Sequence, residues 1–491
     1  MNYIIISVVI TLLGYIILKT KERSLRGFSN YKTIKRPQVT ALVQLLSSRY
    51  MKKLLLIGLL ILNHSAFGQD SKTTQGIVQF DSELSYKLLE PNQNLRKVNI
   101  LINERKKDSS ANTRFIIGTS LISIFDYQKS NTDSKFAYLM RHPTSNNQIG
   151  KEASEAVVHS FQLSVTGQIN NWLGLHSEIL YNPEQSFGAG TITALGRNQL
   201  QLRKGFVILG DLNKFPIYGA IGKMDAPFGQ TGSVSPFTNS TMWHAFGGLG
   251  YGAQVGFDKW GINGSFMLVQ GGAQFRAMHM PVGDSTNVPS KLNNFAADIN
   301  YTFQFSDKST YKIGASYMHG SAYCQDFPVT HFAACGENNP AYTFYAKLKL
   351  FDRIEVKGGY AETLKIWKGT HNPTPPLDIF EASKVSSLDI GAKYNFNIDG
   401  DYVYSISGEF SNFRAGADGS PWERQNQIVA GLSVQFKKAS KIFVELFRTD
   451  GYAPLNFISG SDPFAPFAPG ETHSLRSANS MGIVIGAQLT L

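Results

Sequence analysis

The chain has 491 residues, of which 17% are charged and 12% are aromatic. A mean hydropathy of −0.14 excludes a protein with several membrane-spanning helices, because each of these needs about 20 consecutive apolar residues. Few charges and many aromatic side chains also exclude a disordered chain, since such a chain buries apolar surface readily. A large protein built mainly from β-strands remains.

The net charge of +11 is concentrated at the start of the chain. Residues 1–69 contain ten of the 47 basic residues but one of the 36 acidic residues, Glu22. Residues 70–491 therefore carry 37 basic and 35 acidic residues, a net charge of +2. The basic pI gives little support to nucleic-acid binding, and we expect no nucleic-acid partner.

Two apolar runs precede the body of the chain. Leu54–Leu62 follows a positively charged start at Met51 and precedes small residues, so we expect residues 51–68 to be a signal peptide. The earlier apolar run lies within residues 1–50, which we interpret as an upstream extension from a misassigned start. An inner-membrane anchor is the alternative interpretation of that run.

Residues 69–112 separate the signal peptide from the first expected strand, and we expect a periplasmic leader. Five apolar residues in this segment have a spacing close to that of a coiled coil: Leu84, Leu88, Leu95, Val98 and Ile102. Pro91 would break a continuous helix there. The sequence therefore favours a disordered leader, with a short periplasmic coiled coil as the alternative.

From residue 113 onward, apolar and polar residues alternate with a period of two. In Asn294–Phe305 every second residue is apolar, beginning with Phe295, and the residues between them are mostly polar. In a strand these two sets point to opposite faces. Sixteen such strands are expected, at 114–125, 157–168, 172–182, 198–210, 215–224, 249–258, 260–270, 293–305, 309–319, 341–351, 353–363, 385–397, 401–413, 425–438, 440–450 and 480–491.

The connections between these strands are short and long in turn. The expected strand ends leave single residues at Lys259, Asp352 and Ala439, so those ends overrun, because a hairpin needs about two turn residues. Antiparallel barrels of outer membranes have short periplasmic turns and long outer loops. We therefore predict an all-β fold, a transmembrane antiparallel barrel of about sixteen strands over residues 113–491, located in the outer membrane with both ends in the periplasm.

A closed barrel of this size is wide enough to leave a water channel, and two features bear on its use. The third long connection, Asp225–Gly248, is rich in glycine, proline and aromatic residues. A loop folded into the channel is expected there, with an ordinary surface loop as the alternative. Its expected constriction residues are Pro227, Phe228, Gly229, Trp243 and His244.

The second feature is the charge on the inward faces. Strand phase turns ten charged residues toward the channel: Arg203, Lys312, Lys347, Lys349, Lys357, Lys393, Asp298, Glu355, Asp389 and Glu409. A small basic excess in a channel favours anions. Plain solvation of a wet wall is the alternative reading of the same residues.

The remaining motifs point away from catalysis and metal binding. Cys324 and Cys335 suit an oxidising compartment and predict a loop disulfide, while a metal site with His319 or His331 is the weaker alternative. No metal-binding histidine pair and no nucleophile elbow occurs, and the His176–Glu178 pair suggests a wet wall more than an active site. We expect no catalytic residues, no metal and no cofactor.

Two segments resemble a superfamily of outer-membrane porins. Ile221–Gly229 resembles the strand and Pro-Phe-Gly turn that precede the third outer loop of phosphate-selective porins O and P and of siderophore porins. Gly250–Phe257 resembles the following strand of the siderophore porins. The resemblance implies a homotrimeric passive pore, inserted into outer-membrane lipid by the barrel assembly machinery. One departure is Leu491, where such barrels usually end in Phe or Trp.

Two functions therefore follow as hypotheses. The first is a porin for passive diffusion of small hydrophilic solutes, with anions or iron chelates preferred. The second is a structural or adhesive barrel with a blocked lumen.

Overall fold

A computed structural model describes the part of the chain that contains the barrel. The described residues are 77–90, 96–107, 113–136, 150–181, 200–230, 232–270, 292–324, 338–453, 470–472 and 474–491. The segments expected as an upstream extension (1–50) and a signal peptide (51–68) lie outside them. Among the helices of the described residues, none combines the length and the apolar character needed to cross a bilayer.

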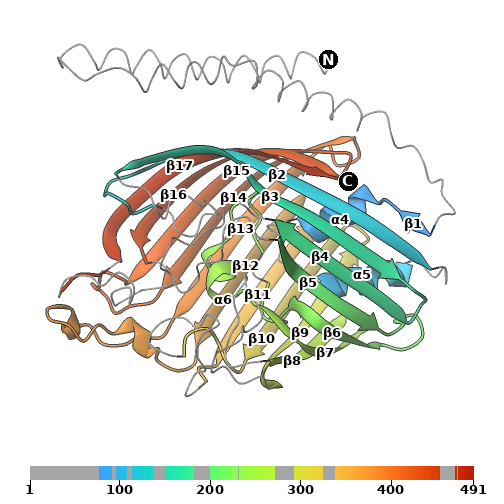
Figure 1. Cartoon of the computed structure of the whole chain (residues 1–491), viewed down its shortest axis with the longest axis horizontal. Coiled ribbons are helices and arrows are strands. Elements are labelled where there is room, and N and C mark those ends of the chain that lie inside the picture. The colour runs from blue at the N-terminus through green and yellow to red at the C-terminus, as the bar shows by residue number, and fades with distance from the viewer. Residues whose placement is uncertain are drawn as a thin grey trace, which may run out of the picture. The chain divides into compact units, whose positions relative to one another are not determined.

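Sixteen antiparallel strands of the described residues form one closed sheet (Figure 1). Each strand pairs with its neighbours in sequence, and the last strand pairs with the first to close the barrel. The strands are β2 (Arg114–Ser130), β3 (Glu152–Gln168), β4 (Leu173–Tyr181), β5 (Leu200–Leu209), β6 (Ile217–Asp225), β7 (Leu249–Lys259), β8 (Ile262–Gln270), β9 (Leu292–Ser306), β10 (Ser309–Met318), β11 (Ala341–Leu350), β12 (Ile354–Thr363), β13 (Ser386–Phe396), β14 (Tyr402–Arg414), β15 (Arg424–Phe436), β16 (Ser440–Tyr452) and β17 (Leu475–Thr490).

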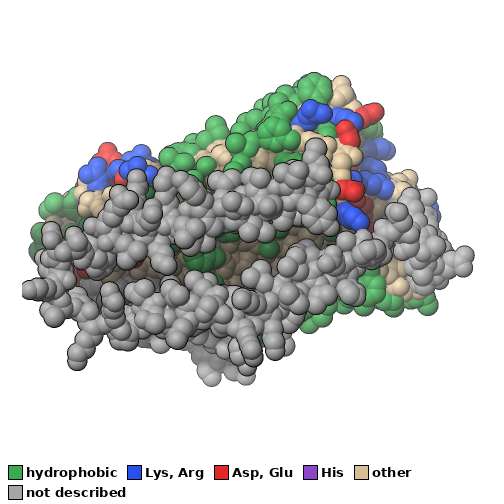
Figure 2. Space-filling view, turned by 90° about the horizontal axis from the view of Figure 1, so that it is seen from above, with side chains coloured by type: hydrophobic (Ala, Val, Ile, Leu, Met, Phe, Trp, Pro, Cys, Tyr) green, Lys and Arg blue, Asp and Glu red, His purple; other side chains and the backbone are tan. Residues whose placement is uncertain are grey.

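The two faces of each strand differ as the alternation predicts. In β9, Ile299 is 61% exposed and Phe303 44% exposed on the outer face, whereas Asp298 and Asn300 are each 5% exposed. Figure 2 shows hydrophobic side chains over the uncovered part of the outer wall, with charged side chains gathered toward its ends. A closed sheet pairs its backbone groups internally, so this apolar wall can face hydrocarbon.

The short turns correct the predicted single-residue connections. The turn between β7 and β8 has two residues, Trp260 (φ 57°) and Gly261 (φ 79°). The turns after β11 and β15 also contain two consecutive residues with positive φ, Phe351 and Asp352 in the first and Lys437 and Lys438 in the second. Positive φ at both central residues gives a turn the twist of its flanking strands, which is why these hairpins close tightly.

The segment before the barrel differs from the predicted disordered leader. It contains a short strand β1 (Val78–Gln79), which pairs in parallel with β2, and two helices, α4 (Ser82–Leu89) and α5 (Lys97–Lys107). Asp81 begins α4 by accepting a hydrogen bond from the Leu84 N–H at 2.9 Å. Both helices lie against the inner wall of the barrel, beside β2 to β6 (Figure 1).

The coiled-coil spacing therefore corresponds to a buried helix face inside the barrel. Leu84, Leu88, Val98 and Ile102 are all buried, and Leu95 lies outside the described residues. These side chains belong to the same apolar cluster as Phe206, Ile208 and Tyr218 on the inner faces of β5 and β6. This part of the inner wall is thus apolar and covered by α4 and α5, whereas the sequence predicted a polar, water-filled lumen along the whole wall.

The outer half of the lumen is also filled in part. The loop between β6 and β7 contains helix α6 (Thr241–Phe246), and the loop between β12 and β13 contains two 3₁₀ helices, η2 (Lys368–Thr370) and η3 (Leu377–Ile379). Trp367 and Trp422 are each no more than 1% exposed and pack in the apolar cluster beneath these loops. The barrel therefore holds less open water than its strand number alone implies.

Candidate functional site: the inserted loop and the charged wall

Residues 226–248, which join β6 to β7, lie against the inner faces of distant strands. The Gly229 N–H donates to Ser316 Oγ of β10 at 2.9 Å. The Thr241 N–H donates to Ser411 Oγ of β14 at 3.1 Å. The described residues of this connection, which exclude residue 231, cross the lumen from β6 to the far wall, and we call this segment the inserted loop.

Glu445 of β16 forms the most complete anchor of the inserted loop. Its carboxylate accepts hydrogen bonds from the Phe237 N–H at 2.6 Å and from the Thr238 hydroxyl at 2.6 Å. The Thr238 N–H adds a third donor at 3.1 Å. Hydrogen bonds to a buried carboxylate contribute about 1.5–3 kcal/mol, roughly twice the value for neutral partners.

A second carboxylate, Glu409 of β14, holds the preceding part of the loop. It accepts hydrogen bonds from the Ser233 hydroxyl at 2.7 Å and from the Val234 N–H at 2.9 Å. Lys357 Nζ lies 3.7 Å from Glu409 and 2.9 Å from Asp389. Glu409, one of the residues expected to line the channel, thus holds the loop in place, and Lys357 links it to Asp389.

The residues expected to form the constriction have different environments. Phe228 is 3% exposed and packs on Phe246 with ring centroids 6.0 Å apart. Trp243 is 7% exposed and has an edge contact with His244, which is itself half-buried. Pro227 is buried and Gly229 is half-buried. The aromatic rings of Phe228 and Trp243 therefore pack inside the loop instead of projecting into open water.

Nine of the ten wall charges lie on inward faces, and Arg203 lies in a bulge of β5. Two of the ten are linked to the start of α5, one directly and one through Glu178. Asp298 of β9 pairs with Arg96, and Arg203 of β5 lies 3.6 Å from Glu178, which pairs with Lys97. These positions are covered by the N-terminal helices, so they do not line an open channel in this conformation.

Six of the remaining eight wall charges form two rows across β10 to β13. In the first row, Lys312, Lys347 and Lys357 are direct cross-strand partners. In the second row, Glu355 lies between Lys349 and Lys393. Lys347 forms an ion pair with Glu355.

Three of these lysines keep their charge unpaired. Within the described part of the chain, no ion pair involves Lys312, Lys349 or Lys393. Lys349 is exposed and the other two are half-buried, so all three are open to water inside the barrel. Lys312 lies directly opposite Lys347, where like charges repel, and Lys349 and Lys393 lie on either side of Glu355. We call these three side chains the lysine cluster.

The pair of His176 and Glu178 gives no sign of catalysis. His176 Nδ1 is 2.9 Å from Thr166 Oγ1, and its Nε2 is 3.9 Å from Glu178. Both residues are buried beneath α5, where Glu178 pairs with Lys97. No group of three or more possible metal ligands occurs among the described residues.

The cysteine prediction stays open, because Cys335 lies outside the described residues and Cys324 ends a described segment. We expect a disulfide between them. Peptide mass mapping of alkylated protein should give a linked peptide that disappears after reduction. Two singly alkylated cysteines in the unreduced protein would contradict the pairing.

Sequence reasoning did not identify Glu445, Lys97 or Arg96 as functional residues. Glu445 carries a signal in hindsight, because it is acidic and shares the inward phase of β16 with Phe443 and Phe447. Lys97 and Arg96 lie in a segment with no strand pattern. Only the fold shows that they enter the barrel.

The geometry defines a class of protein. A closed antiparallel sheet with an apolar outer wall, short turns at one end and long loops at the other is a transmembrane β-barrel of the outer membrane. No protein-family model matches the chain. A UPF0422 protein of Coxiella burnetii is 23% identical over 166 residues, which are 34% of this chain and 32% of that protein. The chain therefore spans about a third of the length of that relative.

Solved structures with a similar fold include three porins, none more than 13% identical. An anion-selective porin from Comamonas acidovorans has a TM-score of 0.44 at 12% identity, covering 77% of this chain and 100% of that one. OprB of Pseudomonas putida has a TM-score of 0.46 at 8% identity over 80% and 96% of the two chains. OmpF of Salmonella typhi has a TM-score of 0.45 at 13% identity over 77% and 98%. Likeness at this level carries no conclusion about function.

Proposed function

We propose that the protein is an outer-membrane porin for passive diffusion of small hydrophilic solutes, with a preference for anions. The observation that carries this proposal is the lysine cluster, Lys312, Lys349 and Lys393, on the water-accessible inner wall. A channel lined by one sign of charge favours ions of the other sign. The inserted loop, held by Glu409 and Glu445, would narrow the same path.

Single-channel recording in planar bilayers tests this function. We expect discrete open steps, and a reversal potential in a salt gradient that indicates anion preference. Correctly folded barrels that stay silent in every variant would contradict the pore, and cation preference would contradict the selectivity. Anionic iron chelates are candidate solutes because of the resemblance to siderophore porins, and blockade of the current by such a chelate would support them.

A single charge reversal tests the lysine cluster directly. Lys349→Glu changes the local charge by two units, which shifts the energy of an ion at about 8 Å by about 1 kcal/mol, in opposite senses for anions and cations. We therefore expect the ratio of anion to cation permeability to fall about thirtyfold at low salt. The reversal potential measures this ratio. Lys308→Glu, in the exposed turn after β9, is the matched control and should change it much less. Equal effects of the two substitutions would show that the cluster does not face the conducting path.

A structural or adhesive barrel with a blocked lumen remains the second candidate function. The observation that favours it is the packing of α4 and α5 against the inner wall. The proposal also includes a homotrimer and insertion by the barrel assembly machinery, both of which rest on the resemblance to porins.

A further inference from the structure

We propose that α4 and α5 form a displaceable plug at the periplasmic end of the lumen, and that seating of the plug is coupled to the inserted loop. This inference rests on the proposed pore function, since a plug regulates a barrel only if the barrel conducts.

The inner wall is shaped to receive α4. Gly118 of β2 lies where a side chain would collide with the helix, because an added Cβ would be 2.8 Å from the Ser85 Cβ. Leu88 and Leu89 of α4 are each 1% exposed against this wall. The apolar contact keeps the plug seated at rest, since burial of apolar side chains is favourable.

Charged groups of the wall complete the seat. Lys97 of α5 pairs with Glu178 of β4, and both side chains are almost completely buried. Arg203 lies 3.6 Å from the same carboxylate. When the plug leaves, Glu178 and Arg203 would become hydrated groups on the wall of a water-filled pore. These wall charges therefore have a partner in both states: the plug when the barrel is closed, and water when it is open.

Two cations connect the plug with the inserted loop. Lys441 Nζ of β16 donates to Glu90 at the end of α4, at 2.6 Å, and to the Pro236 carbonyl of the loop, at 2.7 Å. Arg96, which precedes α5, donates to Asp298 at 2.8 Å and to the Gly229 carbonyl at 3.4 Å. Movement of the plug would therefore alter the support of the loop at two separate points.

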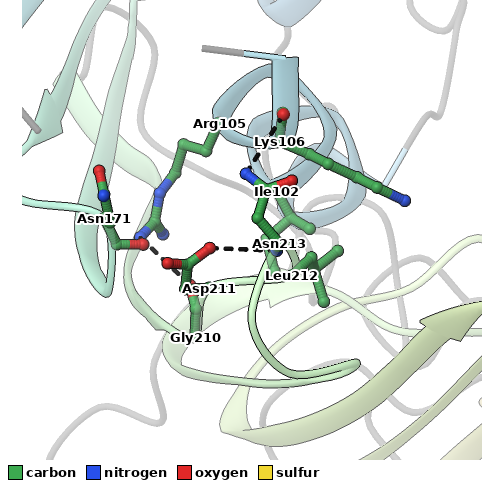
Figure 3. Close-up of a pocket in the computed structure, with 8 residues that line it drawn as sticks. All are labelled: Ile102, Arg105, Lys106, Asn171, Gly210, Asp211, Leu212 and Asn213. Carbon is green, nitrogen blue, oxygen red and sulfur yellow. Dashed lines mark hydrogen bonds between the residues drawn. The ribbon is translucent and has the colours of Figure 1, made fainter. Parts of the chain in front are cut away.

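A polar latch holds the periplasmic end of α5 (Figure 3). The Arg105 guanidinium donates to the carbonyls of Asn171 and Gly210, in the turns after β3 and β5, and Asn213 donates to the Lys106 carbonyl. These turns lie at the periplasmic rim. Hydrogen bonds at the rim exchange readily with water, so this end of the plug is the place where displacement would begin.

The protonation of Lys97 also affects how firmly the plug is seated. Burial lowers the pKa of Lys97 to about 7, although Glu178 opposes this shift and favours the ammonium form. Because burial disfavours the ammonium form, the plug is held less firmly while Lys97 keeps its proton than after Lys97 loses it.

A reversible disulfide tests the displacement. In the full chain, Ser85→Cys combined with Gly118→Cys joins α4 to β2 after an outward shift of about 1 Å, which brings the Cβ spacing to about 3.8 Å, the usual value for a disulfide. The disulfide prevents α4 from leaving the wall. We therefore expect the open probability in planar bilayers to be at least about tenfold lower in the oxidised protein than in the reduced protein. Wild-type protein with and without reductant controls for the native cysteines.

Thiol labelling provides a readout that does not require conduction. Ser85 is 1% exposed, so in the Ser85→Cys protein a thiol reagent should react only when the plug moves. Arg105→Ala opens the latch and is expected to raise the labelling rate about tenfold. Lys107→Ala, a substitution on the exposed side of α5, is the matched control and should leave the rate unchanged.

Labelling of Val234→Cys, a buried loop position, tests the coupling. Arg105→Ala should raise this rate together with that of Ser85→Cys, and a rise at Ser85 alone would overturn the coupling. If Ser85→Cys is unreactive in both backgrounds, or if the disulfide leaves open steps unchanged, the displaceable plug is refuted. Labelling without any conductance would instead refute the pore and leave the displacement supported.

Discussion

The Glu445→Ala protein is expected to lose the attachment of its inserted loop to β16. Phe237 and Thr238 donate three hydrogen bonds to this one carboxylate, which is 0% exposed. Alanine leaves these donors without their partner inside the barrel. Loss of a buried charged acceptor costs about 3 kcal/mol, so the detached loop should become about a hundredfold more populated.

Two measurements report on this loss. Open-channel current noise should increase because the loop moves within the conducting path, and Val234→Cys should label faster. Glu445→Gln is the matched variant, because its amide oxygen still accepts hydrogen bonds but carries no charge, and it should have an intermediate effect. Wild-type noise and labelling in Glu445→Ala would show that the loop is held by its packing alone.

Raising the pH from 7.5 to 9.5 is expected to seat the plug more firmly. Burial lowers the pKa of Lys97 to about 7 in the seated state, against 10.5 for an ordinary lysine. Between these values the displaced plug binds one more proton than the seated plug, so displacement becomes less favourable as the pH rises. Below pH 7 both states are protonated, and the cost of burying the charge is fully present.

The expected size of this effect is about seventyfold between those pH values, because one proton is released on seating and the two values are two pH units apart. The charged and titratable groups that face Lys97 are His176, Glu178, Arg203, Lys204 and Asp225. The labelling rate of Ser85→Cys, divided by that of an exposed Lys107→Cys thiol, measures seating independently of thiol ionisation. Lys97→Met should abolish the dependence. A ratio that stays constant in the wild-type background would show that Lys97 keeps its proton when seated.

The strands were predictable because the direction of a side chain in a strand depends only on its position along the chain. The alternation around Ile299 and Asp298 gave the outer and inner faces of β9 that the structure has. Sixteen strands and the order of short and long connections were confirmed in the same way. Strand ends at Lys259, Asp352 and Ala439 were less accurate, because turn conformation depends on backbone angles that alternation does not encode.

The contents of the barrel could not be predicted in this manner. Lys97 and Glu178 are 81 positions apart in sequence, and Phe237 and Glu445 are 208 apart. No local sequence pattern predicts either contact, because each depends on which strands the closed sheet places on opposite sides of the lumen. The apolar spacing of Leu84, Leu88 and Ile102 was visible, but such a stripe can face a partner helix or a barrel wall equally well.

The sequence alone determined that the chain forms a closed barrel with an apolar outer wall, because the bilayer demands paired backbone and a period of two satisfies that demand locally. Only the tertiary structure decided what occupies the interior. Closure brings the N-terminal helices and the third outer loop into one lumen, where buried charges must find partners wherever the fold provides them. The plug and its contacts with the inserted loop arise from that requirement.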